Sequence, residues 1–286
     1  MLRKLAFMPG IIVPGALLLA ACGGSSSDSS SSNESVSPVP VTIEFEATVN
    51  DVALACDTAY PNVGTAATTV QIKDFRMFVH GVELITTDQQ AIPLNLDSNV
   101  WQAQGVALLD FEDATGACTG TAETHTALTG TIPGDAADIT GIRFTVGIPE
   151  NLNHLEQAGV SPFNVTGMNW GWTNGFKFIR FDIENWNVHV GATGCVADIN
   201  GDVSCSNANR PQIQFDNFDY QTQRIRIDYA ALVQASDVST DTGGAVGCMS
   251  GGTDPECNDV FTQLGLNLAT GDNDSGLVQT VFSVAN

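Results

Sequence analysis

Positive charge is scarce in this sequence. Ten lysines and arginines stand against 32 aspartates and glutamates, which gives a formal net charge of −22 at pH 7. A surface this acidic repels the phosphates of nucleic acids and of anionic bilayers, so both are excluded as surface partners. Such a charge is compatible with binding to cations or to basic proteins, and it also favours solubility.

The sequence also lacks the common catalytic motifs. It contains no G-x-S-x-G elbow, no P-loop, no H-E-x-x-H zinc motif and no C-x-x-C-H haem attachment site. We therefore predict a protein that is not an enzyme. A hydrolase that uses a pair of carboxylates stays open as a third hypothesis, because acidic residues are plentiful and none of them stands out.

Long apolar runs are absent beyond the N-terminus. The run from Ile11 to Leu19 follows Arg3 and Lys4 and is too short for a membrane span, which is typical of a secretory signal. It ends in Leu-Ala-Ala-Cys, which resembles a bacterial lipoprotein processing box with Cys22 as the lipid-bearing residue. A lipid is then the only predicted contact with a membrane.

This reading divides the chain into three parts. Residues 1–21 are the predicted signal peptide, residues 22–40 a serine-rich linker, and residues 41–286 one folded domain. The mature protein is expected in the cell envelope as a lipoprotein. The outer membrane is favoured, with the periplasmic and the surface-exposed faces both open.

Helical periodicity is scarce as well, whereas alternation of apolar and polar residues recurs. In the stretch VTIEFEATVN, Val41, Ile43 and Phe45 would share one face of a strand. In QIKDFRMFVHGVEL, Phe75 and Met77 would lie opposite a polar face that carries Asp74, Arg76, Phe78 and His80. Further strands are expected at Gly141–Ile148, Gly175–Ile183, Trp186–Val190, Gln212–Phe215, Arg224–Tyr229 and Val278–Val284, and short helical turns at Leu152–Ala158, Ala230–Ala235 and Asn258–Leu264.

These patterns predict an all-β domain, an antiparallel β-sandwich with long loops and a few short helices. Beyond Cys22 the chain has six cysteines, an even number that in an exported protein indicates three disulfides. Fifteen pairings are possible. Spacing favours the local pairs Cys195–Cys205 and Cys248–Cys257, which leaves Cys56–Cys118, with a thiolate metal site as the competing reading.

Few residues could hold a transition metal. The sequence has four histidines, His80, His125, His154 and His189, and each of them could be structural. Three of them lie near predicted strand ends and could converge, whereas His125, in the threonine-rich stretch TAETHTALTG, is expected at the surface. Met168 lies two residues before Trp170, and a thioether with imidazoles would favour Cu(I) over Zn, Ca or Mg.

The stretch GMNWGWTNGFKF carries Trp170 and Trp172 among glycines, which favours a loop over a buried strand. Calcium is the alternative ion. Asp198-Ile-Asn200-Gly-Asp202 and the segment 270–276 (TGDNDSG) place oxygen ligands at alternate positions, but neither is a full twelve-residue calcium loop, so turns are expected there.

An ordered set of short stretches resembles the MbnP-like family of exported copper-binding proteins. The stretches are FRMFVHGVEL, WQAQGVALLDFED, IPENLNH, MNWGWTNGFKFIRFDIE, HVGATGC, NRPQI, AALV and GCMSGGTDPECNDVFTQLGL, and the likeness runs from about Val41 to the C-terminus. The family is described by four cysteines, which correspond to Cys195, Cys205, Cys248 and Cys257. Cys56, Cys118 and the lipid anchor go beyond that pattern.

The resemblance implies a specific chemistry. The partner in this family is MbnH, a di-haem cytochrome of the MauG type, which would oxidise Trp170 to kynurenine so that the protein binds one Cu(I). The implied ligands are His154 and His189, with His80, Met168 and the modified Trp170 as further candidates. Trp172 would be a packing ring or an electron relay.

The competing hypothesis is an acidic cell-surface domain without a transition metal, which calcium could stabilise and which would meet a protein or a glycan. It predicts that His80, His154 and His189 lie far apart, because a metal ion needs its ligands about 2 Å away.

Overall fold

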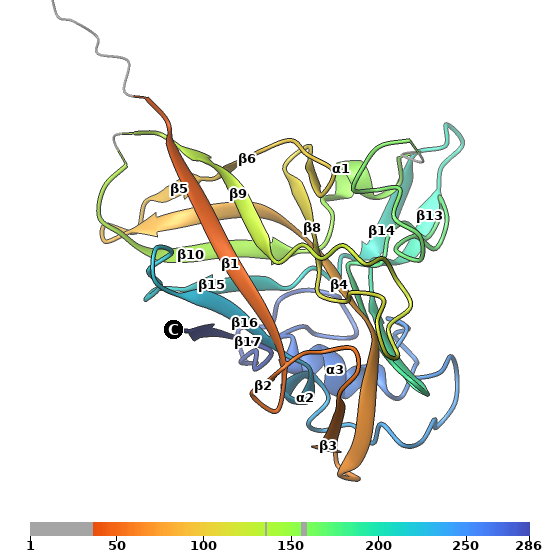
Figure 1. Ribbon diagram of the computed structural model, residues 1–286. Coiled ribbons are helices and arrows are strands. Elements are labelled where there is room, and N and C mark those ends of the chain that lie inside the picture. Colours follow the sequence, from red (N-terminus) through yellow and green to blue (C-terminus); the bar gives the residue numbers. More distant parts are fainter. Residues whose placement is uncertain (1–36, 135, 156–158) are drawn as a thin grey trace, which may run out of the picture. The chain divides into compact units, whose positions relative to one another are not determined.

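The computed structural model describes residues 37–134, 136–155 and 159–286 (Figure 1). The predicted signal peptide, the lipidation site Cys22 and the linker up to residue 36 lie outside these residues. None of the helices in the described part of the chain is long and apolar enough to cross a bilayer.

Two sheets form the domain. The first has the order β17-β16-β1-β9-β6, with β2 beside β1. Its strands are β1 Val39–Val49, β2 Val52–Ala53, β6 Asn95–Leu96, β9 Ala127–Ile132, β16 Arg224–Asp228 and β17 Phe282–Ala285. The predicted alternation in β1 is confirmed, because Val41, Ile43 and Phe45 are buried between exposed or half-buried neighbours.

The second sheet has the order β12-β11-β4-β10-β15, with the remaining strands paired along β4 and β8. Its strands are β3 Ala59–Val63, β4 Thr68–Thr86, β5 Ala91–Pro93, β7 Gln102–Ala103, β8 Val106–Asp110, β10 Ile139–Val146, β11 Ile179–Ile183, β12 Trp186–Val190 and β15 Gln212–Phe215. The all-β sandwich is therefore confirmed. One pair departs from the antiparallel expectation, since β1 and β16 run parallel.

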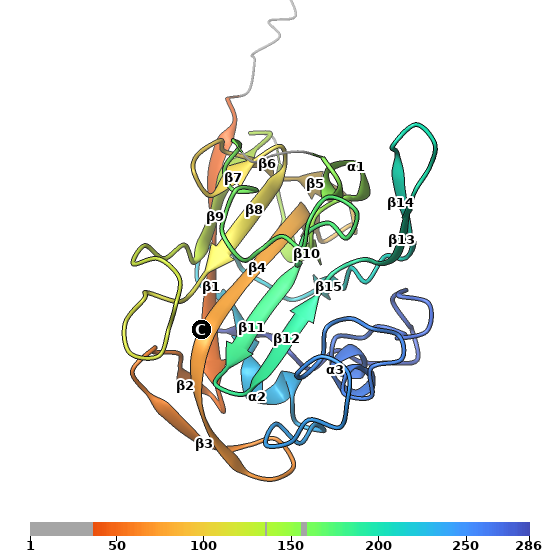
Figure 2. The same ribbon diagram turned by 90° about the vertical axis from the view of Figure 1, so that its right-hand side faces the viewer.

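Three short helices and one separate hairpin complete the domain. The helices are α1 Glu150–Asn153, α2 Tyr229–Leu232 and α3 Cys257–Gln263, close to the predicted turns but beginning earlier. The hairpin of β13 (Thr193–Ala197) and β14 (Val203–Asn207) stands clear of both sheets in Figure 2. The predicted strands at 175–183 and 278–284 are shorter than expected, because regular pairing begins only at Ile179 and Phe282.

All three predicted disulfides are present. Cys195–Cys205 joins β13 to β14, Cys248–Cys257 ties the preceding loop to α3, and Cys56–Cys118 links two loops 62 residues apart in sequence. The cysteines are therefore not available as a thiolate metal site in this structure.

The long strand β4 corrects one expectation, because its supposed polar face is buried. Phe78 lies in a second apolar cluster with Met168, Phe163, Phe176 and other side chains on the loops that cover this face. The face opposite packs into the main core, where the rings of Phe75 and Phe181 stack 3.7 Å apart. Strand β4 is thus a central strand with both faces covered.

The charged residues on the covered face of β4 form an ion-pair chain with the next strand. Asp74 pairs with Arg76 and, at 3.1 Å, with Arg180 of β11, while Arg180 Nε donates to Asp182 Oδ2 at 2.8 Å. Burial disfavours the charge of Arg76, yet the hydrogen bond and charge of Asp74 leave its pKa raised. Removing one partner from such a buried group leaves a charge without compensation.

We expect Arg76→Met to lower the free energy of unfolding by about 3 kcal/mol, the lower end for a broken buried pair, because Arg180 still contacts Asp74. The matched control is Arg143→Met, which removes the half-exposed pair with Glu83 and should cost less than about 1 kcal/mol. Urea unfolding of both variants measures the difference. Equal losses would contradict a buried, energetically coupled network.

Candidate metal centre

The segment Asn169–Phe176, called the Trp170 loop here, lies at the second apolar cluster, which includes Met168 and Phe176. Backbone hydrogen bonds join the two ends of the loop. Asn169 and Phe176 form an isolated bridge, Trp170 N donates to Gly175 O at 3.0 Å and Lys177 N donates to Met168 O at 2.9 Å. The chain turns at Gly171, whose φ of +111° is a conformation that favours glycine. The predicted loop is confirmed, and it points the two tryptophans into different surroundings.

Trp170 is half-buried and lines a cavity of about 300 Å³. The other lining residues are Asn174, Ala192, Thr193, Gly194, Cys195 and Met249. Gly191 leaves room for the ring, because a Cβ at this position would lie 2.4 Å from Trp170 Cζ3. Lys177 Nζ lies 5.8 Å from the indole centroid, in cation–π range.

His189, on β12, lies next to this ring, with centroids 6.3 Å apart. Its Nε2 donates to Asp182 Oδ1 at 2.7 Å, so the ion-pair chain of β4 and β11 ends on this imidazole. Burial opposes ionisation of Asp182, but the His189 hydrogen bond and the charge of Arg180 hold its pKa below the usual value. A neutral imidazole that donates through Nε2 keeps its lone pair on Nδ1.

That Nδ1 atom is buried and has no hydrogen-bond partner. An unsatisfied buried nitrogen costs roughly 1–3 kcal/mol, so it requires an explanation. A metal ion would satisfy it, since a neutral imidazole held by a carboxylate is a common metal ligand.

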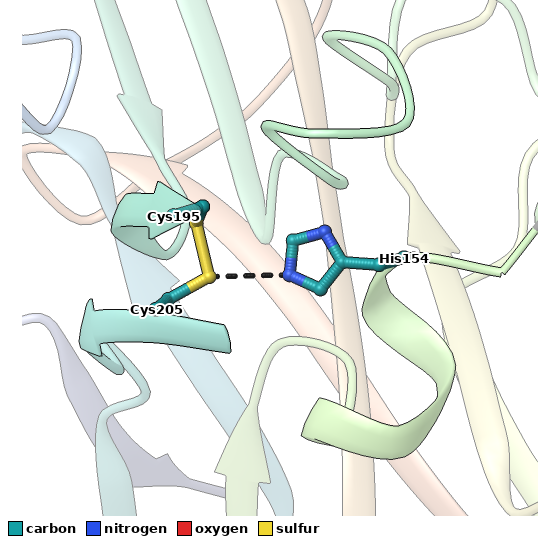
Figure 3. Close-up of side chains that lie close together, drawn as sticks. All are labelled: His154, Cys195 and Cys205. Atoms are coloured by element: carbon teal, nitrogen blue, oxygen red, sulfur yellow. Dashed lines mark hydrogen bonds between the residues drawn. A yellow bond between two sulfur atoms is a disulfide. The ribbon is translucent and has the colours of Figure 1, made fainter. Parts of the chain in front are cut away.

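His154, at the end of α1, is engaged on both ring nitrogens. Asn153 Nδ2 donates to Nε2 at 3.0 Å, which leaves Nδ1 to donate to the carbonyl of Trp172 at 3.0 Å. Nε2 also lies 3.1 Å from Cys205 Sγ (Figure 3). His154 thereby fixes the backbone of the Trp170 loop at its second tryptophan.

His154 with Cys195 and Cys205 is the one group of three potential His, Cys, Asp or Glu ligands within 4.8 Å of one another in the described part of the chain. Figure 3 shows the imidazole facing the Cys195–Cys205 disulfide. Disulfide sulfurs are not thiolates, so this group is not a ready-made metal site.

His80 and His125 each contact a backbone carbonyl. His80 Nδ1 donates to Gly147 O at 2.8 Å, and burial together with the charge of Arg210 lowers its pKa. His125 was expected at the surface, and this is wrong: it is half-buried, its ring stacks on Trp101 and its Nδ1 donates to Leu108 O. The described residues contain no cluster in which His80, His154 and His189 share a site within 4.8 Å.

The two methionines close to the candidate site in sequence or space have different surroundings. Met168 is 0% exposed within the second apolar cluster and does not line the Trp170 cavity, whereas Met249 does. The available signal for Met249 was its place in GCMSGG, beside a disulfide cysteine.

Trp172 and the two candidate calcium turns lie at the surface. Trp172 is 48% exposed and borders a separate cavity of about 370 Å³, so it is not a core packing ring. Asp198 Oδ1 accepts from Asn200 N and Asp202 N, and Asp274 Oδ1 accepts from Gly276 N, as turn residues do.

Comparison with known proteins agrees with this fold. A family model described as MbnP matches residues 38–250. Among solved structures, MbnP from Methylosinus trichosporium is similar with a TM-score of 0.78 and 32% identity, over 87% of this chain and 99% of that chain. No match was found among curated proteins.

We expect Gly191→Ala to displace the Trp170 ring, because the added Cβ would collide with it. The Trp170 contribution to fluorescence, taken as the difference from the matching Trp170→Phe chain because Trp101, Trp172 and Trp186 also emit, should shift. The free energy of unfolding should fall by about 1–3 kcal/mol. Gly252→Ala is the control, since a Cβ there meets nothing within 4 Å. An unchanged spectrum would place Trp170 away from Gly191.

Proposed function

The chain belongs to the MbnP family, and from this membership we propose that it is an exported, lipid-anchored protein that binds Cu(I) in the Trp170 cavity. The observation that carries the proposal is the buried, unpartnered Nδ1 of His189 beside the half-buried ring of Trp170. The protein would store or hand over copper rather than catalyse a reaction, and its location would be the outer membrane.

The ligand types around Trp170 support copper over harder ions. Met249 lines the cavity and offers a thioether, and neither aspartate nor glutamate is among the lining residues. His189 is not a lining residue, but it lies next to the Trp170 ring and offers an imidazole nitrogen. Soft sulfur and imidazole ligands favour Cu(I), whereas Ca²⁺ and Mg²⁺ require oxygen. We therefore assign Met249 the role that the sequence suggested for Met168.

The side chain of Trp170 must be converted to kynurenine before it can bind Cu(I). An indole N–H is a donor only. Two equivalents of hydrogen peroxide, used by an MbnH-like di-haem partner, would break the C2–C3 bond and add one oxygen to each carbon, with release of two waters. C3 becomes a ketone and C2 a formyl group on nitrogen, and hydrolysis by one water releases C2 as formate. The resulting kynurenine carries an aniline nitrogen with a lone pair. Trp172 lies two residues further along the chain and is exposed, so it is suited to relay electrons to the haem protein.

We also keep His80 and His154 as candidate copper ligands, after His189 and Met249. His154 holds the Trp172 carbonyl, and the lowered pKa of His80 keeps its imidazole neutral, with Nε2 as the lone-pair nitrogen. His189 and Met249 are the ligands we place first.

Co-expression with the di-haem partner should convert Trp170 to kynurenine, detected by peptide mass spectrometry, and the product should bind one Cu(I). Trp170→Phe should fold normally and lose tight binding. Trp101→Phe is the control, because Trp101 stacks on His125 and the substitution leaves both Trp170 and Trp172 in place. Retained tight binding in Trp170→Phe would refute the kynurenine assignment. Absence of copper binding by every form, modified or not, would instead favour the acidic interaction domain.

In the modified protein, His189→Ala and Met249→Leu should each weaken Cu(I) binding, and Asp182→Asn should weaken it by the roughly 10–100-fold typical of a residue that orients a ligand. Competition with a colorimetric Cu(I) chelator measures the change. His125→Ala, whose ring stacks on Trp101, is the matched control. Equal affinities in His189→Ala and the control would remove His189 from the centre.

A further inference from the structure

Lys177 is a buried lysine that no carboxylate neutralises. It lies between Phe176 and Phe178 of the second apolar cluster and is 9% exposed. Across residues 37–134, 136–155 and 159–286, none of the ion pairs includes this lysine, and its ammonium group donates no hydrogen bond. Buried lysines are normally paired, so an unpaired one requires an explanation.

The ammonium group of Lys177 lies beside the ring of Trp170. Its Nζ is 5.8 Å from the indole centroid, and its backbone N–H donates to Met168 O at 2.9 Å, which fixes Lys177 next to the Trp170 loop. The π electrons of the ring attract the cation. This attraction holds the charge at the ring but does not cancel it, because an indole has no net charge.

The charged groups around Lys177 neutralise one another. Two carboxylates and two guanidinium groups act on it: Asp74, Asp182, Arg76 and Arg180. These four groups already pair among themselves in the ion-pair chain of β4 and β11, and their formal charges sum to zero. Burial, and next the charge of Arg180, lowers the pKa of Lys177, as expected for a positive charge that is held at a cost. One positive charge is therefore left without compensation beside Trp170.

This charge acts on any ion that enters the Trp170 cavity. Neither aspartate nor glutamate is among the residues that line the cavity, so its wall offers nothing to offset the repulsion. The Coulomb energy is proportional to the charge of the incoming ion, so a divalent cation is repelled twice as strongly as a monovalent one. The cavity thus disfavours divalent cations by charge, in addition to any preference set by its ligands.

We propose that Lys177 sets the ion selectivity of the Trp170 cavity, so that monovalent Cu(I) is favoured over divalent cations. The inference rests on the proposed function, because it concerns the ion that the same cavity binds. Ligand type alone does not complete this selection, since imidazole also binds Cu(II) and Zn²⁺. Lys177 is not itself a ligand, because an ammonium group has no lone pair.

The first experiment measures the charge at Trp170 in the unmodified chain, without copper and without the di-haem partner. Iodide and caesium ions quench tryptophan emission by collision, and a positive charge attracts iodide and repels caesium. The Trp170 contribution is the difference from the matching Trp170→Phe chain. Lys177→Met should lower the ratio of iodide to caesium quenching at least about threefold at equal ionic strength, a modest change because salt screens the charge.

The second experiment uses protein in which the co-expressed partner has converted Trp170 to kynurenine. Competition with a Cu(I) chelator and, separately, with a Cu(II) chelator gives the two affinities and their ratio. A unit charge about 6 Å away in a medium of intermediate polarity changes such a ratio about tenfold. Lys177→Met should therefore lower the preference for Cu(I) over Cu(II) by about this factor.

Two control variants accompany both experiments. Lys177→Arg keeps the positive charge and should match the unaltered chain. Arg224→Met removes one positive charge from a half-exposed pair on β16, in the other sheet, and should also leave both ratios unchanged. Circular dichroism confirms folding, and Lys177→Gln is the second neutral variant if Lys177→Met misfolds.

An unchanged quenching ratio or an unchanged affinity ratio in the folded neutral variant would overturn the role of Lys177. Absence of copper binding by the converted, unaltered chain would contradict the proposed function instead. In that case a lowered quenching ratio in Lys177→Met would still support a cavity that excludes divalent cations by charge, and an equal ratio would overturn it.

Discussion

Arg180 lies between two buried carboxylates, and much of the described site depends on that contact. It joins Asp74 of β4 to Asp182 of β11, and Asp182 in turn accepts from His189 of β12. Charges in a weakly polar interior are stable only when each is paired, so the three strands keep this register or lose the pairing. The last member of the chain, His189, is oriented as a consequence, and its free nitrogen lies on the side away from Asp182.

The Trp170 loop depends on the same face of the sheet. The second apolar cluster covers β4, Gly171 turns the chain and Gly191 makes space for the indole. His154 fixes the carbonyl of Trp172. The two tryptophans are thereby separated: Trp170 lines a cavity together with a methionine, and Trp172 is exposed at the surface.

The groups around Trp170 come from separate parts of the chain. His189 of β12 lies next to the indole ring, and Met249 lines the same cavity as Trp170. Met249 is adjacent in sequence to Cys248, whose disulfide with Cys257 ties that segment to α3. Neither aspartate nor glutamate is among the residues that line this cavity.

The sequence by itself determined the all-β class, the three disulfides, the loop at GMNWGWTNGFKF and membership of the family, because alternation, cysteine spacing and short motifs are local properties. It could not determine which methionine lines the cavity with Trp170, that the polar face of β4 is buried, that His125 stacks on Trp101, or that β16 runs parallel to β1. Met249 is distant in sequence from Trp170, and the partners of Asp74 and His189 come from neighbouring strands. Contacts of this kind follow from strand order and register, which depend on packing of the whole chain, so only the tertiary structure decided them.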